Sequence, residues 1–326
     1  MLSPDQVGSF RTAGWITVAS VFSTEQAQEL SQVSKAISES HLENAVNSVA
    51  ESHSLTPLDA RTVIGRAISG DRSAQATVKA SASARSSLPG TVMRAAADDS
   101  RQLGHVARQA DTATGLGLST GAAGFAVDDF DVSTQDEAKI FPRKVNDPYA
   151  QDERYRAIVH DPGLRALAEQ LIGKPCRVYG SQVFIKYQGL GAEKPFHQDN
   201  FYFQIKDCAD VLTCWCALDD ASVENGCMQM VPGSHQRGIV NHDAHPQRET
   251  HLVAQMTDED RASATPAPVR AGGIVCWSGA MLHGSSENTS PHGRCAYAIH
   301  FVASDCELLP GAPPTDFERY ESVAKL

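Results

Sequence analysis

Basic residues are scarce in this sequence, and long apolar runs are absent from it. Lys and Arg total 28 against 39 Asp and Glu, so the formal net charge is −11. Binding to nucleic acids or to anionic lipid surfaces needs an excess of positive charge, which this chain lacks. No run of about 18 or more apolar residues occurs, and the N-terminus has no basic segment followed by an apolar one. We therefore expect a cytoplasmic protein that binds neither nucleic acid nor membrane.

Aromatic residues and cysteines are missing from a long internal stretch. Between His41 and Gly124 there is no Phe, Tyr, Trp or Cys, and Ala, Ser, Thr and Gly dominate. This composition offers little material for a core. We predict that residues 41–135 form an insertion of helices and loops, which acts as a lid or a contact surface. One helix is expected within it, capped by Thr56 with Pro57 at its first position. Its expected apolar face consists of Leu58, Val63, Ile64, Ala67 and Ile68.

The eight cysteines lie in the second half of the chain, without the spacing of a disulfide framework or a zinc site. Most stand in apolar runs, and Cys214-Trp215-Cys216 is not a CxxC motif. Free thiols behave as small buried hydrophobic groups, which is the interpretation we adopt.

Helix signals occupy the first half of the chain and strand signals the second half. One helix is expected to begin at Ser23 or Thr24, and another to open with Asp161 and Pro162 and close at Gly173. Short strands punctuated by turns follow, at residues 177–187, 209–220, 228–234, 272–279 and 293–303. This order predicts a mainly β protein, an antiparallel jelly roll with helices packed on one outer face. We expect one domain over residues 1–326, with its catalytic core at 136–306.

A candidate metal site begins in the segment 195–203. His197 and Asp199 are two residues apart, so on an extended strand they project to the same face while Gln198 points away. Two histidines and one carboxylate on one side of a metal leave positions open for other ligands. His283 follows an apolar strand and precedes a turn, which would direct its imidazole toward a cavity.

A candidate carboxylate-binding arginine opens the last strand, eleven residues after His283. Alternation places Arg294, Ala296, Ala298 and His300 on one face of that strand. Two alanines leave room beside a guanidinium, which binds carboxylates through two parallel hydrogen bonds. An ordinary ion pair of Arg294 is the structural alternative.

The other histidine-bearing motifs are given structural roles. Residues 232–235 form a shaped loop in which His235 bonds the backbone or supports the metal site. The segment containing His242, His245 and His251 has no regular zinc spacing and is expected to be a solvated loop. The Asn225-Gly226 pair is a turn signal without assigned chemistry.

Together, His197-Gln198-Asp199, the run at residues 217–238, and His283 followed by Arg294 resemble the phytanoyl-CoA dioxygenase family of non-haem Fe(II)- and 2-oxoglutarate-dependent oxygenases. The resemblance is weak over residues 6–37 and good over 139–301. It implies a double-stranded β-helix core, in agreement with the jelly roll predicted from the strand pattern.

The resemblance also implies roles for individual residues. The iron ligands would be His197, Asp199 and His283. The 2-oxoglutarate contacts would be Arg294, Ser285, Trp215, Thr213, Gln182 and Lys139. Lys186 would contact the substrate or the co-substrate. Separately, because they directly follow the ligand motif, we expect Asn200, Phe201, Tyr202 and Gln204 to line the substrate pocket. For Gln182, Lys186 and Lys139 a solvent-facing position is the alternative, and for the aromatic pair it is sheet packing.

The activity implied is oxidation of a small molecule by Fe(II), 2-oxoglutarate and O2, with release of succinate and CO2. Asp199 favours hydroxylation, because related halogenases replace this carboxylate with a small residue. The alternative is a metal-binding jelly roll without oxygenase activity, or an isomerase or hydrolase that uses another divalent metal. A site without keto-acid chemistry would not need the arginine, so Arg294 discriminates between the two.

Overall fold

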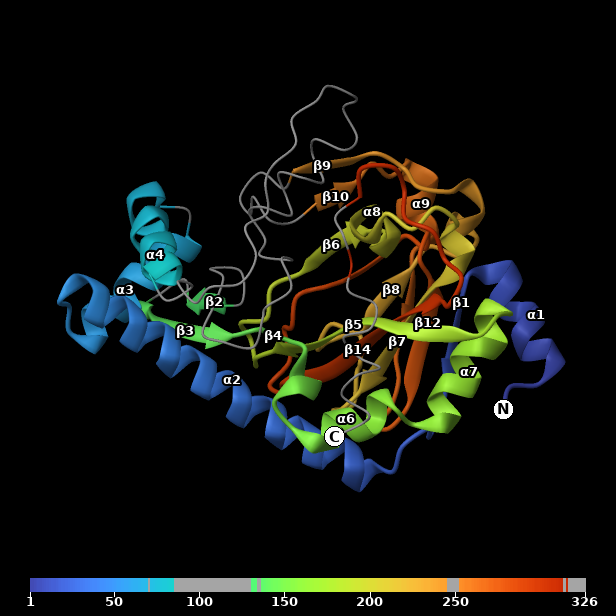
Figure 1. Cartoon of the computed structure of the whole chain (residues 1–326), viewed down its shortest axis with the longest axis horizontal. Helices are drawn as coiled ribbons and strands as arrows, with labels where there is room; N and C mark the ends of the chain where they lie inside the picture. The colour runs from blue at the N-terminus through green and yellow to red at the C-terminus, as the bar shows by residue number, and fades with distance from the viewer. Residues whose placement is uncertain (70, 85–129, 134–135, 245–251, 313–314, 316–326) are drawn as a thin grey trace. The chain divides into compact units, whose positions relative to one another are not determined.

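The computed structural model describes residues 1–69, 71–84, 130–133, 136–244, 252–312 and 315 (Figure 1). Its internal contacts divide the chain into two units. The first, which we call the barrel unit, contains Met1–Ala36, Lys144–Asp243 and Leu252–Leu326. The second, the insertion unit, contains Ile37–Arg143 and Ala244–His251. The predicted limits of the insertion, 41–135, stay a prediction.

Two antiparallel sheets form the barrel unit. The larger sheet has six strands in the order β1-β12-β7-β14-β5-β4 and the smaller has four in the order β11-β8-β13-β6. The strands of the larger sheet are β1 Trp15–Val18, β12 Ile274–Ser278, β7 Val211–Ala217, β14 Arg294–Ala303, β5 Cys176–Lys186 and β4 Lys144–Asn146. Those of the smaller sheet are β11 Thr265–Ala267, β8 Met228–Met230, β13 His283–Ser285 and β6 Lys194–His197. Every neighbouring pair in both sheets is antiparallel, which confirms the predicted jelly-roll class.

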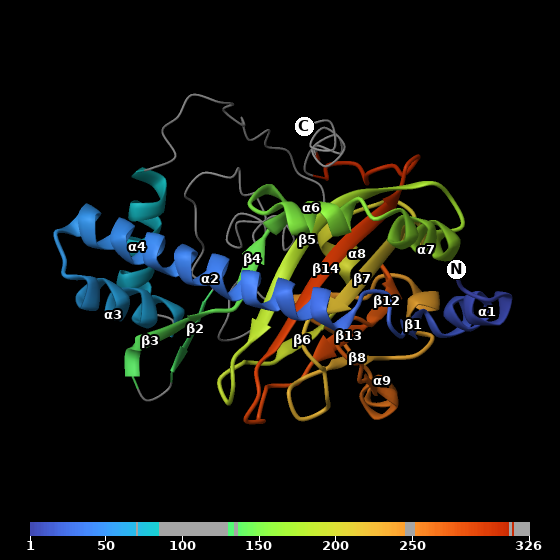
Figure 2. The same ribbon diagram turned by 90° about the horizontal axis from the view of Figure 1, so that it is seen from below.

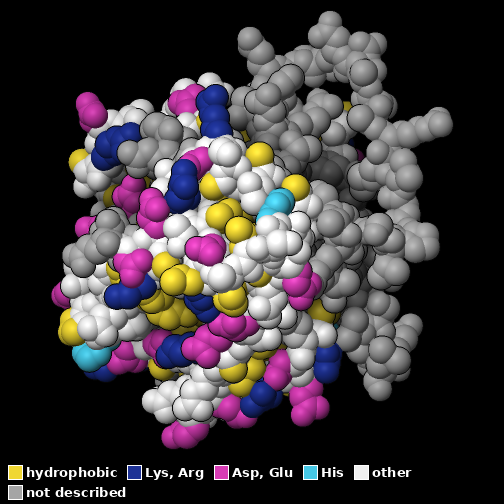
Figure 3. All heavy atoms as spheres, turned by 90° about the vertical axis from the view of Figure 1, so that its left-hand side faces the viewer, with side chains coloured by type: hydrophobic (Ala, Val, Ile, Leu, Met, Phe, Trp, Pro, Cys, Tyr) yellow, Lys and Arg dark blue, Asp and Glu magenta, His cyan; other side chains and the backbone are white. Residues whose placement is uncertain are grey.

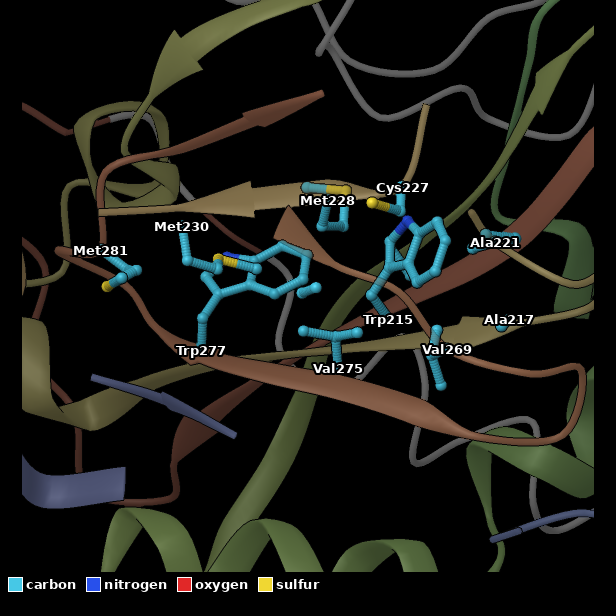
Figure 4. Close-up of a cluster of buried hydrophobic side chains, with 13 residues drawn as sticks. Trp215, Ala217, Ala221, Cys227, Met228, Met230, Val269, Val275, Trp277 and Met281 are labelled. Carbon is cyan, nitrogen blue, oxygen red and sulfur yellow. The ribbon is translucent and has the colours of Figure 1, made fainter. Parts of the chain in front are cut away.

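A buried apolar cluster fills the space between the two sheets (Figure 4). Trp215 and Val275 project from the larger sheet, and Met228 and Met230 face them from the smaller one. Each of these side chains is at most 6% exposed. Burying a large apolar side chain contributes roughly 1.5–3 kcal/mol, so this layer holds the two sheets together and keeps water out of the space between them.

Helices cover the outer face of the six-stranded sheet (Figure 2). Helix α7, Pro162–Ile172, begins and ends as predicted: the Asp161 side chain accepts from the backbone N–H of Leu164 at 2.7 Å, and Gly173 is left-handed. In α6, Glu153–Val159, the ring of Tyr155 lies edge-on to Tyr297 of β14, with 4.8 Å between ring centroids. This contact places Tyr297, on the outer face of β14, beneath a helix.

The remaining elements of the barrel unit are short. They are α1 Pro4–Ala13, α8 Asp199–Phe203, α9 Asp258–Ser263, the strand pair β9 His242–Ala244 and β10 Leu252–Ala254, and 3-10 turns at Pro148–Ala150, Cys208–Asp210 and Ser234–Arg237. In the last of these turns His235 bonds the backbone carbonyl of Arg11 at 3.1 Å, one of the two roles expected for it.

The insertion unit has a small core of its own. It contains most of α2 Thr24–His53, with α3 Pro57–Ile68, α4 Arg72–Ala84, and the hairpin of β2 Phe130–Ser133 and β3 Asp136–Pro142. Helix α2 begins where expected but runs on through residue 41. The buried residues are Leu42, Ala45, Val46, Val49, Ala60, Ile64, Ala67, Ala74, Val78 and Ile140. This core therefore consists of aliphatic and small side chains and contains no aromatic residue among those described.

Helix α3 follows its sequence signals at the N-terminus but not over its whole predicted apolar face. The Thr56 hydroxyl accepts from the backbone N–H of Asp59 at 3.2 Å, as a cap should. Leu58, however, is 64% exposed, so its expected place on the buried face is wrong. The buried face follows Ala60, Ile64 and Ala67 at helical spacing, which turns position 58 toward solvent.

The described part of the chain has a mixed surface charge and no strongly apolar long helix. On the face drawn in Figure 3, acidic and basic side chains are interspersed. No helix among the described residues combines the length and the apolar character needed to span a bilayer.

His242 differs from its predicted position in a solvated loop. It is 5% exposed and stacks on Phe201 with 4.1 Å between ring centroids. Its Nδ1–H donates to the Val240 carbonyl at 2.9 Å, and its Nε2 accepts from the backbone N–H of Gln198 at 3.1 Å. Burial lowers the pKa of His242 to about 4. His245 and His251, predicted in the same loop, lie outside the described residues.

We predict opposite effects for one substitution at two helical glycines. A Cβ added to Gly65 in α3 would overlap the Glu137 carbonyl, whereas one added to Gly8 in α1 meets nothing within 4 Å. Gly65→Ala should therefore lower the free energy of unfolding, and Gly8→Ala should raise it by about 0.5–1 kcal/mol through helix propensity. Urea titrations followed by circular dichroism measure both. Equal effects of the two substitutions would contradict the packing of α3 on β3.

We also predict an acid-sensitive contribution from His242. Its folded pKa, about 4, lies below the unfolded value of about 6.5, so only the unfolded chain takes up this proton between those pH values. The free energy of unfolding should therefore decrease as the pH falls from about 6.5 to about 4, by up to about 3 kcal/mol from this group. His242→Gln should flatten that part of the profile of unfolding free energy against pH. An unchanged profile would show that His242 is not buried in its neutral form.

Candidate metal centre

Three buried side chains bring their ligand atoms together at one end of the two sheets. The Nε2 atoms of His197 and His283 lie 3.6 and 3.5 Å from Oδ1 of Asp199. Metal bonds of about 2.1 Å at right angles would place ligand atoms about 3 Å apart. The two distances to Asp199 are close to this value, and all three ligand atoms lie within 4.8 Å of one another. Among the described residues, no other group of three or more His, Cys, Asp or Glu ligand atoms is gathered in this way.

The backbone holds both histidines in the form that binds a metal. His197 on β6 and His283 on β13 are direct partners across neighbouring strands. The Nδ1 atom of His197 is 2.8 Å from the Pro195 carbonyl, and that of His283 is 2.9 Å from the Met281 carbonyl. A carbonyl can only accept, so Nδ1 carries the proton and Nε2 presents its lone pair toward Asp199.

Asp199 reaches the centre from a helix rather than from a strand. The strand β6 ends at His197, and Asp199 is the first residue of α8. Gln198 between them is still extended, and so its side chain points away from the two ligands as expected. There its amide donates to the carbonyls of Gly238 and Ala280, at 2.8 and 2.5 Å. The expected extended geometry therefore holds through Gln198, and a helical turn begins at Asp199.

Donors from the larger sheet occupy the second oxygen of Asp199. Thr213 Oγ1 donates to Oδ2 at 2.6 Å, and Trp277 Nε1 donates to the same atom at 2.8 Å. Thr213 pairs with Trp277 on one side and with His300 on the other, so the three side chains form a row across β12, β7 and β14. Because the Thr213 hydrogen goes to Asp199, Nδ1–H of His300 is the donor in its 2.9 Å contact with Thr213.

The electrostatics of the centre favour a neutral imidazole and an ionised carboxylate. Burial, followed by the neighbouring His283, holds the pKa of His197 well below its ordinary value. Burial alone would raise the pKa of Asp199, but His283, His300 and His197 more than offset it and leave that pKa well below the usual range. These are the protonation states that metal ligands need.

Arg294 is a buried cation with vacant hydrogen-bonding capacity. It is 2% exposed, one Nη2–H donates to the Gly226 carbonyl at 3.1 Å, and Nε has no partner. Burial lowers its pKa to about 10. Its guanidinium lies over the ring of Trp215, 5.0 Å from the centroid. Thr213, which bonds Asp199, is two residues from Trp215, about 7 Å along the strand.

Lys186 lies beside Arg294, and Ser285 lies beside Lys186. Lys186 pairs with Arg294 across β5 and β14, and its Nζ donates to the Ser286 carbonyl and, at 3.4 Å, to that of Ser285. Both Lys186 and Ser285 are buried. A Cβ on Gly226 would lie 3.1 Å from Lys186 Nζ, so this turn packs closely against the lysine. The turn predicted without chemistry therefore contacts both cations.

Gln182 and Lys139 occupy different units. Gln182 pairs with Ala298, which places it on the inner face of the larger sheet, partly exposed. Lys139 belongs to β3 of the insertion unit and its side chain is exposed. Its role toward 2-oxoglutarate stays a prediction.

The residues after the metal ligands have divided roles. The Asn200 side chain bonds the backbone of Ile205 in both directions, at 2.8 and 3.0 Å, and so closes the turn after α8. Gln204 caps the C-terminus of that helix in a left-handed backbone conformation. Phe201 stacks on His242, while the Tyr202 ring lies 5.9 Å from that of His197. Tyr202 is thus the member of this group whose ring lies near that of a candidate metal ligand.

Two contributors to the centre were not assigned from the sequence. The sequence pattern places Trp277 in an apolar strand and His300 on the same strand face as Arg294, and it gives neither residue a role at the metal centre. Both lie opposite Thr213 in the strand register, a relation that pairing creates and that no local motif contains. Alternation alone could have placed them on inner faces but not beside Asp199.

Comparison with solved structures shows the same fold at low sequence identity. The chain aligns with the non-haem α-ketoglutarate-dependent carbocyclase SnoK from nogalamycin biosynthesis with a TM-score of 0.55 and 18% identity, covering 100% of this chain and 91% of the other. EvdO2 from Micromonospora carbonacea gives a TM-score of 0.57 at 16% identity, covering 96% of both chains.

Comparison with sequences identifies the family. Phytanoyl-CoA dioxygenase domain-containing protein 1 of Mus musculus is 34% identical over 158 residues, 47% of this chain and 54% of its own length. The chain thus spans about half of that relative. L-proline trans-4-hydroxylase of Streptomyces griseoviridis is 35% identical over 183 residues, 50% of this chain and 68% of its own. The family model described as phytanoyl-CoA dioxygenase matches residues 10–296. The chain therefore belongs to the phytanoyl-CoA dioxygenase family.

Proposed function

We propose that this protein is an Fe(II)- and 2-oxoglutarate-dependent dioxygenase that hydroxylates a C–H bond of a small molecule and releases succinate and CO2. The observation that carries the proposal is the convergence of two Nε2 atoms and one carboxylate oxygen in the same core as a buried arginine that forms no ion pair with any described carboxylate. Two neutral imidazoles and one carboxylate are a donor set that suits Fe(II) and leaves neighbouring coordination positions open.

The chain's residues would divide the work between binding and exclusion of water. His197, Asp199 and His283 would hold Fe(II), which supplies the chemistry of O2 and the keto acid when bound. The Arg294 guanidinium would bind the distal carboxylate of 2-oxoglutarate, because an unpaired buried cation is stabilised by an anion of complementary shape. Trp215 would line the channel between the two. The apolar layer between the sheets would keep water from the reacting atoms.

A metal-binding barrel that acts without a keto acid, or as an isomerase or hydrolase, is the alternative function. It would account for the three ligands equally well. It gives no reason for a buried arginine stacked over Trp215, the residue two positions along β7 from Thr213, whose hydroxyl bonds the carboxylate ligand. The position of Arg294 therefore favours the dioxygenase.

Cellular location and substrate class form a further part of the proposal. All eight cysteines are free and six of them are buried, as is usual for proteins of a reducing compartment, so we place this activity in the cytoplasm. L-proline trans-4-hydroxylase acts on an amino acid, as its name states, and a small molecule of comparable size is the class we propose here. We propose Tyr202 and Lys186 as candidate substrate contacts.

The first test is succinate release. Protein loaded with Fe(II) under anaerobic conditions should form succinate from 2-oxoglutarate when O2 and a pool of small metabolites are added. His197→Ala should lower this rate by at least about 100-fold, because it removes a metal ligand. His292→Ala, which changes an exposed histidine on a turn, is the matched control and should leave the rate unchanged. Equal rates for wild type and His197→Ala would refute the proposal.

The second test separates the arginine from the metal ligands. Arg294→Ala should weaken 2-oxoglutarate binding by about 10- to 100-fold, because it removes charge-assisted hydrogen bonds, and should leave metal affinity unchanged. Arg294→Lys should bind with intermediate affinity, since it keeps the charge and loses the planar fork. Anaerobic calorimetry with Mn(II) and then 2-oxoglutarate measures both affinities. Equal losses of metal and 2-oxoglutarate affinity would rule out a direct carboxylate contact.

A further inference from the structure

We propose that Trp277 is a positioning residue of the metal centre, which holds Asp199 as a ligand through one oxygen only. The inference rests on the proposed function, because it concerns the same metal ligands. It assigns a role to a tryptophan that the ligand motifs themselves do not contain. The argument depends on the hydrogen bonds of the Asp199 carboxylate and on the strand register that supplies them.

The two oxygens of Asp199 have different surroundings. Oδ1 faces Nε2 of His197 and His283, at 3.6 and 3.5 Å. Oδ2 accepts from Trp277 Nε1 at 2.8 Å and from Thr213 Oγ1 at 2.6 Å. A carboxylate oxygen has two lone pairs, so these donors use the full capacity of Oδ2. Turning Oδ2 toward a metal would break two buried hydrogen bonds to a charged group.

Trp277 touches two of the three proposed ligands at once. Besides its bond to Asp199, its ring lies 4.6 Å from that of His283, measured between centroids. The indole is 3% exposed and belongs to the same buried cluster as Met230 and Met281 (Figure 4). Close packing leaves such a side chain little freedom. One rigid ring therefore fixes the distance between a carboxylate on α8 and an imidazole on β13.

A single-oxygen contact has a consequence for the reaction. An octahedral metal with three protein ligand atoms keeps three positions for 2-oxoglutarate and O2. A carboxylate that bound through both oxygens would occupy one of them. The hydrogen bonds of Trp277 and Thr213 thus preserve the open position, in addition to strengthening the site.

Trp15, a neighbour of Trp277, provides a matched control. Trp15 on β1 is the cross-strand partner of Trp277 and packs against the same cluster. Its Nε1 has no hydrogen-bond partner, so a change to Phe removes no bond there. Trp277→Phe and Trp15→Phe therefore make the same chemical change in adjacent places. Only the first removes a donor from Asp199.

The experiment measures metal affinity by anaerobic equilibrium dialysis with Fe(II) and with Co(II). Trp277→Phe should weaken binding by about 10- to 100-fold, the range found when groups that orient metal ligands are removed. Trp15→Phe should bind as the wild type does. Thr213→Val removes the other donor and should weaken binding in the same direction. A crystal structure of Trp277→Phe with Co(II) should show Asp199 turned so that Oδ2 approaches the metal.

The outcomes separate this inference from the proposed function. If wild type binds no metal at these residues, the proposed function fails. If wild type binds and a folded Trp277→Phe binds equally well, the positioning role is refuted while the metal site stands. Thermal unfolding of each variant shows whether it is folded. Should Trp277→Phe not fold, Thr213→Val decides the question, and an unchanged affinity there overturns the inference.

Discussion

A carboxylate buried between two sheets must replace its lost water with hydrogen-bond donors or a cation, and the centre of this protein is arranged around that requirement at Asp199. Thr213 and Trp277 supply donors to one oxygen, and two imidazoles face the other. The donors come from two strands of the larger sheet and the imidazoles from the smaller sheet. Asp199 therefore links the two sheets at the point where the chemistry is proposed.

The apolar layer and the polar centre depend on each other. Side chains such as Val275 and Met230 exclude water, which strengthens every electrostatic interaction nearby. The same exclusion makes an unpaired charge costly, and Arg294 is placed in it with a free Nε. A carboxylate-bearing co-substrate would satisfy that group. Under the proposed function, the jelly roll would thus offer complementary groups to both ends of a keto acid.

Local patterns predicted three of the helices, five of the strands and the candidate ligands, and long-range pairing explains the contacts that they missed. The caps at Thr56 and Asp161 were identified because capping is a property of a few adjacent residues. The strands were identified because alternation has a short period. His242 was misplaced because its burial depends on Phe201 and on the backbone of Gln198, forty or more residues away. No periodicity contains such a contact.

By itself, the sequence determined the jelly-roll class, the candidate ligand set and the arginine, since motif spacing and side-chain alternation are written into adjacent residues. Only the tertiary structure decided how the ligands are held. It ends β6 at His197 and starts a helix at Asp199, and it brings Trp277 and His300 to either side of Thr213. The physical reason is that strand register sets which side chains become neighbours, and register is a property of the assembled sheet.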